Sequence, residues 1–125
     1  MTTKTRLAKV FDGATDGIPY YAPDHPRLSP ADRTRPLAYL AAGAPLLVTT
    51  ATEPDFVDPA RGEVVPMSFR TDGTWIWNDA LAYYLTEYGF APEPDFLAAM
   101  QAADWQCPTP PQDVVERALE ELFAD

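Results

Sequence analysis

The sequence predicts an α+β domain in which a small antiparallel sheet packs against three to four helices. Three observations favour this fold class. The chain has 125 residues with 46% hydrophobic content, which suits a single packed domain spanning residues 1–125. Two strand-like runs, 63–70 and 74–77, flank an Asp-Gly pair, which is the pattern of a tight hairpin. A segment that begins at Pro111 repeats apolar residues at helical spacing.

The first part of the chain predicts an irregular arm and then a helix. Residues 1–27 are rich in proline and predict one short strand followed by the arm. The helix is expected to begin at Ser29, whose side chain can cap it, with Pro30 at the first helical position. Pro36 is expected to break or restart this helix, and Gly43 to end it.

The predicted sheet is built from two strands and a hairpin. The run 46–51 contains β-branched residues between prolines and predicts a buried strand. The run 63–70 predicts a second strand, in which Pro66 lacks a hydrogen-bond donor and favours an edge or a bulge. At the turn that follows Asp72, Gly73 is expected to supply the positive φ of a tight hairpin.

Three helices are predicted after the hairpin. Asn78 can cap the first, at 79–88, and Gly89 is expected to end it. The second is expected over residues 95–105. The third, from Pro111 onward, is the most clearly amphipathic segment of the chain.

Charge is distributed unevenly along the chain. There are 19 acidic and nine basic residues, and the net charge is −10. Residues 1–70 hold eight of each sign, whereas residues 71–125 hold eleven acids and one base, Arg117. A net negative protein repels phosphate groups, so we expect no nucleic-acid or anionic-membrane partner. Two explanations remain open, an acidic face that steers a basic partner and a charge that only maintains solubility.

The sequence also predicts where in the cell the protein is located. Its start has no apolar core or cleavage site of a signal peptide, and no stretch approaches the ~18 apolar residues of a membrane span. A single cysteine, Cys107, cannot form an internal disulfide. We therefore expect a cytoplasmic protein.

The residue types that most catalytic sites need are scarce. The one histidine, His25, lies in the proline-rich arm, and the two serines, Ser29 and Ser68, are explained as a helix cap and a strand residue. The acids lack the spacing of a calcium loop, and no glycine-rich phosphate loop precedes a helix. We expect no enzyme activity, no metal site and no cofactor.

An alternative with small-molecule binding or enzyme activity stays open. Asp72, Asp79 and Glu87 lie close in sequence to Trp75 and Trp77. A carboxyl pair against tryptophan would have a raised pKa suited to glycosidase-like or proton-transfer chemistry. The same acids are also explained as a turn residue, a first-turn helix residue and a solvated residue.

Aromatic side chains beside these acids predict a protein interface. Trp75 and Trp77 share one face of their strand, and both a core and an interface position fit this pattern. Tyr83 falls on the helix face opposite the apolar stripe, and interfaces are enriched in Trp and Tyr. The residues expected on this partner-binding face are Asp72, Trp75, Trp77, Asp79, Tyr83 and Glu87.

A proline-stiffened loop at 53–59 is a second candidate for partner binding. It places Phe56 between Asp55 and Asp58. A stiff acidic loop with an apolar tip would suit insertion into a basic active site. A loop held down by its own Phe56 fits the pattern equally well.

The segment 65–77, VPMSFRTDGTWIW, is followed by Ala-Tyr-Tyr-Leu at 82–85 and by Gly89. It resembles small uncharacterised actinobacterial proteins, some of them immunity proteins of polymorphic toxin systems, over about residues 63–105. The resemblance carries no catalytic residues, and it implies a cytoplasmic protein that neutralises a secreted toxin by direct binding. We therefore expect a stoichiometric inhibitor of a basic toxin domain.

Overall fold

The computed structural model describes residues 5–124, so the first four residues of the predicted arm and Asp125 lie outside the described part of the chain. The helices are α1 (Pro30–Ala41), α2 (Asp79–Tyr88), α3 (Pro94–Ala102), α4 (Gln112–Phe123) and the short 3-10 helix η1 (Pro59–Arg61). The strands are β1 (Arg6–Leu7), β2 (Gly13–Thr15), β3 (Ile18–Tyr20), β4 (Ala44–Leu47), β5 (Thr52–Pro54), β6 (Glu63–Pro66), β7 (Phe69–Thr71) and β8 (Trp75–Asn78).

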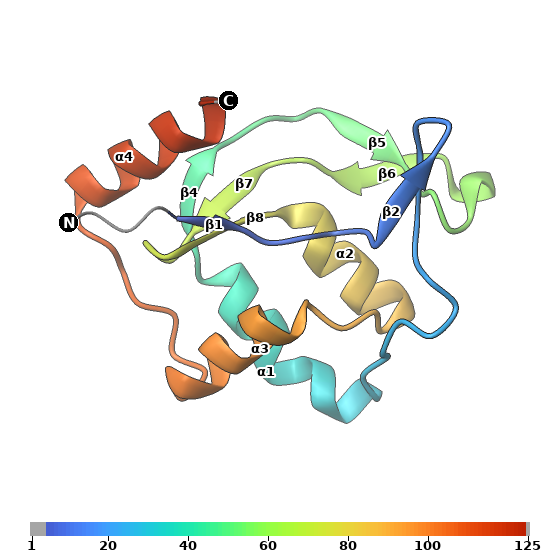
Figure 1. Ribbon diagram of the computed structural model, residues 1–125, viewed down its shortest axis with the longest axis horizontal. Helices are drawn as coiled ribbons and strands as arrows, with labels where there is room; N and C mark the ends of the chain where they lie inside the picture. Colours follow the sequence, from blue (N-terminus) through green and yellow to red (C-terminus); the bar gives the residue numbers. More distant parts are fainter. Residues whose placement is uncertain (1–4, 125) are drawn as a thin grey trace.

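The main sheet has four strands in the order β1-β8-β7-β4 (Figure 1). Strand β8 pairs with β7 antiparallel and with β1 parallel, so the sheet is mixed although mostly antiparallel. Two further pairs, β2–β3 and β5–β6, form separate hairpins. The predicted α+β class is confirmed.

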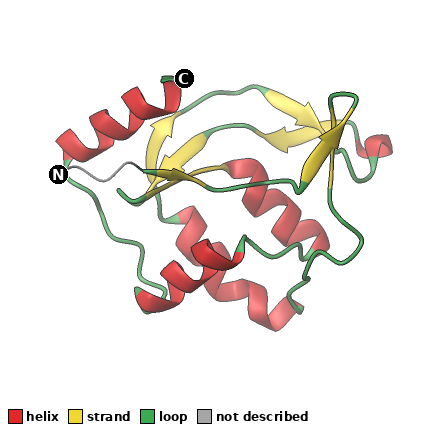
Figure 2. Cartoon of the chain, in the orientation of Figure 1, coloured by secondary structure: helices red, strands yellow, loops and turns green. Residues whose placement is uncertain are grey.

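Both faces of the main sheet are covered by helices (Figure 2). Because side chains alternate along β8, Trp75 and Trp77 point to one face and Ile76 to the other. The tryptophans pack with buried side chains of α1, α2 and α3, whereas Ile76 packs with Leu46 and with Ala118 of α4. The amphipathic pattern of α4 thus places its apolar side on the second face of the sheet.

The Asp-Gly hairpin is confirmed. Asp72 and Trp75 close the turn through a bond from the Asp72 amide to the Trp75 carbonyl, and Gly73 has a φ of +97°. The Asp72 carboxylate accepts the amides of Thr74 and Trp75 at 2.8 and 2.7 Å, which fixes the turn from inside. The caps of α2 are also as predicted, with Asn78 accepting the amide of Ala80 and Gly89 in the left-handed region.

Several boundaries differ from the predictions at proline residues. Helix α1 begins after a Ser29 cap but continues through Pro36, whose buried ring packs into the core and offsets the lost hydrogen bond. The predicted strand 63–70 divides after Pro66 into β6 and β7, which belong to different sheets. The predicted strand 46–51 is shorter and begins earlier, as β4.

The N-terminal arm is more ordered than predicted. Asp16 and Gly17 both have positive φ, the geometry of a tight two-residue turn, and they join β2 to β3. The Asp-Gly pair there carried the same signal as the pair at 72–73. The sequence predicted an irregular arm because prolines are frequent in it and its strands have only two or three residues.

Candidate functional site

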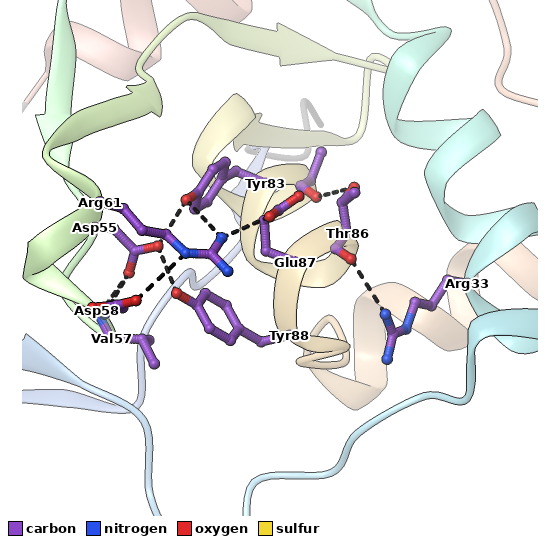
Figure 3. A network of polar contacts seen from close by, with 10 residues as sticks. Arg33, Asp55, Val57, Asp58, Arg61, Tyr83, Thr86, Glu87 and Tyr88 are labelled. Atoms are coloured by element: carbon purple, nitrogen blue, oxygen red, sulfur yellow. Dashed lines mark hydrogen bonds and ion pairs between the residues drawn. The ribbon is translucent and has the colours of Figure 1, made fainter.

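The best-connected polar cluster joins the segment 55–61 to helix α2 (Figure 3). At its centre is Asp55, whose side chain is 0% exposed. Its carboxylate accepts the backbone amides of Val57 and Asp58 at 2.8 Å and the hydroxyls of Tyr83 and Tyr88 at 2.7 Å. The buried charge therefore has four donors.

These donors control the ionisation of Asp55. Burial alone would raise the pKa of its carboxyl group, but the hydrogen bonds from Asp58, Tyr88 and Tyr83 outweigh burial and lower it below the usual value. The group remains a carboxylate at neutral pH. It lacks the raised pKa that a general acid needs.

Arg61 covers the outer side of this cluster. Its guanidinium donates to Glu87 at 2.6 Å, lies 3.6 Å from the carboxylate of Asp58 and sits 5.1 Å from the ring centroid of Tyr88. Its hydrogen bond to the Tyr83 hydroxyl is long, at 3.5 Å. The cluster thus holds the loop against α2 and neutralises two of its acids.

Phe56 anchors the loop from its other side. Its amide donates to the hydroxyl of Tyr84 at 3.0 Å, and its ring lies edge-on to Phe11 at 6.0 Å. Of the two interpretations of this loop, the anchored one describes the structure. Val57 is 42% exposed, so an apolar side chain of the loop faces solvent beside the buried Asp55.

The hairpin residues expected at a partner-binding face are in the core. Trp75 and Trp77 are 3% and 0% exposed, and Trp77 donates its indole N–H to the Leu40 carbonyl. Asp72 is 6% exposed and accepts the Tyr39 hydroxyl in addition to the turn amides. Placing these three residues on a contact surface was wrong, because α1, α2 and α3 cover the tryptophan face of β8 and the Asp72 carboxylate is engaged inside the hairpin turn.

The other expected site residues divide into two places. Asp55, Asp58, Tyr83 and Glu87 meet in the cluster around Arg61, whereas Asp79 lies apart and pairs with Arg70 at 3.0 Å. The three carboxylates considered for acid–base chemistry bond to different residues, Asp72 to Tyr39, Asp79 to Arg70 and Glu87 to Arg61, so no two of them converge as a pair beside the tryptophans.

Two members of the cluster were missed in the sequence. Arg61 is the one base among the acids of residues 53–63, and this isolated position was a signal that the sequence offered. Tyr88 follows the helical spacing of the apolar residues Leu81 and Leu85, and nothing in the local sequence indicates that its hydroxyl reaches Asp55.

Other reactive groups are also engaged. The Nδ1 and Nε2 atoms of His25 lie 2.8 Å from the Asp12 carboxylate and the Ala91 carbonyl oxygen. Burial and Asp72 raise the pKa of the Cys107 thiol to about 11, so the thiol is protonated at neutral pH. Within residues 5–124, no group of three His, Cys, Asp or Glu side chains could hold a metal ion, and no helix has the length and apolarity to cross a membrane.

Folding brings charges of opposite sign together from distant parts of the sequence. Bases of the first half pair with acids of the second, as Arg6–Asp95, Arg61–Glu87 and Arg70–Asp79. The outer face of α4 is different. Asp113, Glu116 and Glu120 are exposed there, and in the described part of the chain none of them forms an ion pair.

Two adjacent cavities lie beside the loop. The larger, about 450 Å³, is bordered by residues 7–11, the β5–β6 hairpin and α2; the smaller, about 320 Å³, is bordered by the arm and Phe90. Phe11 and Phe56 line both cavities and form the wall between them. These volumes fall within the range of about 300–1,000 Å³ that is typical of small-molecule pockets.

Comparison with known proteins gives no match to this chain, among family models, curated proteins or solved structures.

Proposed function

We propose that the protein acts in the cytoplasm by binding a basic protein partner stoichiometrically, as an immunity- or antitoxin-type inhibitor of a toxin domain. The observation that supports this most is the charge left over after folding. The intramolecular ion pairs use Arg6, Arg61 and Arg70, whereas three carboxylates of α4 face solvent without one. This face would be the site of first contact.

The exposed carboxylates of α4 outnumber Arg117, the exposed base of the same helix, and their net negative charge would act on a partner at long range. Complementary charge raises the rate of diffusional encounter and disfavours partners of the same sign. Phe123, at the end of the same helix, is 68% exposed and offers an apolar contact beside the acids. Such a combination of steering charge and aromatic contact suits an inhibitor that must capture a toxin quickly.

The test uses the polypeptides encoded by the genes adjacent to that of this protein. Each is expressed in cells with and without the chain, and the one that stops growth is titrated against the purified chain by calorimetry. We expect restored growth and a 1:1 complex. Asp113→Asn/Glu116→Gln/Glu120→Gln should weaken the complex at least tenfold, because three steering charges are removed.

The matched control removes the same number of charges elsewhere, as Asp16→Asn/Asp24→Asn/Glu63→Gln, at exposed positions on the hairpins and the arm. It should change the affinity by less than threefold. Equal losses in both variants would mean that only net charge matters. A lack of any toxic or binding neighbour, or turnover of a small substrate by the chain alone, would contradict the proposal.

A further inference from the structure

Three Asp-Gly pairs occur in the chain, at 12–13, 16–17 and 72–73. In such a pair the main-chain nitrogen of glycine can attack the side-chain carboxyl group of the aspartate, because glycine has no Cβ to shield the nitrogen or to restrict the backbone. The reaction needs a free carboxyl group, a free amide and a backbone that can rotate to bring them together. The three pairs differ in these conditions.

The pair at Asp72 is protected by the hairpin turn. Its carboxylate accepts the amides of Thr74 and Trp75 at 2.8 and 2.7 Å, and Asp72 is 6% exposed. The Gly73 amide donates to the Thr71 hydroxyl at 3.0 Å. Both groups that would have to join are therefore engaged, within the turn that connects β7 to β8.

The pair at Asp12 is held by contacts to the arm. Its carboxylate accepts the Ala22 amide at 2.7 Å and lies 2.8 Å from Nδ1 of His25. Burial alone would raise the pKa of this carboxyl group, but the hydrogen bonds from Ala22 and His25 outweigh burial and lower it. The attack displaces the hydroxyl of a protonated carboxyl group, so a group that is held as a carboxylate reacts more slowly.

The pair at Asp16 has none of these restraints. Asp16 and Gly17 are exposed at the tip of the β2–β3 hairpin, at the periphery of the molecule (Figure 1). Among the described residues, the Asp16 carboxylate has no hydrogen-bond or ion-pair partner, and the Gly17 amide donates no hydrogen bond. The turn joins strands of three residues each, so it can open locally at small cost and bring the two groups together.

We infer that Asp16 is a site of spontaneous isoaspartate formation, whereas the fold protects Asp12 and Asp72 from the same reaction. The Gly17 nitrogen forms a bond to Cγ of Asp16, and the carboxyl hydroxyl leaves with the amide proton as water, which gives a succinimide ring. One water molecule then opens the ring. Opening at Cγ restores aspartate, and opening at the main-chain carbonyl carbon gives isoaspartate, in which the chain continues through the former side chain.

The modified chain differs from the original in connectivity but not in mass, because one water leaves and one returns. No oxidant, metal or enzyme takes part. Isoaspartate adds one carbon to the main chain at the turn, which the two-residue geometry of this hairpin does not accommodate. The inference is independent of the proposed partner.

The test incubates the intact folded chain at neutral pH for several weeks and measures isoaspartate at each pair by peptide mapping, with fragmentation that distinguishes the two isomers. Isoaspartate at Asp16 should exceed that at Asp12 or Asp72 at least about tenfold, because the two protected sites must first open. A parallel incubation in concentrated urea removes the fold. There the three sites should differ by less than about threefold, because no site has to open before it reacts.

Asp16→Glu is the matched variant, because it keeps the charge but places the carboxyl group one carbon further from the Gly17 nitrogen. The product at this position should disappear in the variant, and the other two pairs should remain unmodified in the folded chain. Isoaspartate at Asp12 or Asp72 equal to that at Asp16 in the folded chain would overturn the inference. So would an absence of product at Asp16 when the chain in urea forms it, or the same preference for Asp16 with and without the fold.

Discussion

Asp55 should contribute more to stability than any exposed acid of the chain. Asp55→Asn keeps an acceptor for the amides of Val57 and Asp58 but loses the negative charge, and its amide group faces the hydroxyls of Tyr83 and Tyr88. Hydrogen bonds to a charged group are worth about 1.5–3 kcal/mol each and neutral ones about 0.5–1.5 kcal/mol. Because the two tyrosines are half-buried and can reach water, we expect a total loss of about 2–3 kcal/mol.

The assay is urea unfolding followed by tryptophan fluorescence, since Trp75 and Trp77 are buried in the folded state. Asp58→Asn is the matched control. Its carboxylate is about half exposed and forms one long ion pair, so its loss should cost less than about 0.5 kcal/mol. If Asp55→Asn lowered the free energy of unfolding no more than Asp58→Asn does, the cluster would not hold the loop as described.

Three further predictions concern the stability of two glycine variants and its dependence on pH. Gly73→Val should lower stability by about 1 kcal/mol or more in thermal melting, because a β-branched residue resists a φ of +97°; an unchanged midpoint would argue against the turn. Gly43→Ala should destabilise by about 2 kcal/mol or more, since the added methyl group would overlap the Trp77 ring, and a melting temperature equal to that of the natural chain would refute this packing. Asp12 and Asp55 have lowered pKa values in the folded protein, so each stabilises the fold above about pH 5. This stabilisation is lost as acidification protonates the two carboxylates. Denaturant midpoints that stay constant down to pH 3 would contradict this prediction.

Local signals predicted much of the fold. The hairpin at Asp72-Gly73, the cap at Asn78 and the amphipathic helix α4 each depend on residues a few positions apart. Proline was the main source of error. Pro36 is buried and tolerated inside α1. Pro66 lies in an edge strand as expected, because β6 pairs only with β5, but the single predicted strand 63–70 ends there and β7 belongs to another sheet.

The candidate site was harder to predict because its contacts are long-range. Asp55 meets Tyr83 and Tyr88 across 28 and 33 residues of chain, and no local pattern reports such a pairing. The tryptophans were ambiguous for a similar reason. Their alternation on β8 was clear, but whether their face meets helices or solvent depends on where α1 and α3 pack.

Ion pairs in the folded protein neutralise part of the excess of acids after residue 70. Counting by halves placed all the excess charge after residue 70, yet arginines of the first half return to neutralise Asp79, Glu87 and Asp95. Helix α4 keeps the acids of its outer side exposed, while its apolar side packs on the sheet.

The measurement that tests the account most directly is the association rate of the natural chain with its toxic partner as a function of ionic strength. Charge is screened over ~30 Å at 0.01 M salt but over only ~8 Å at 0.15 M. The account predicts that stopped-flow association slows at least tenfold between these two conditions. It also predicts that most of this dependence disappears in Asp113→Asn/Glu116→Gln/Glu120→Gln. An association rate that does not change with salt, or one whose salt dependence survives in that variant, would contradict the acidic face of α4 as the surface that captures the partner.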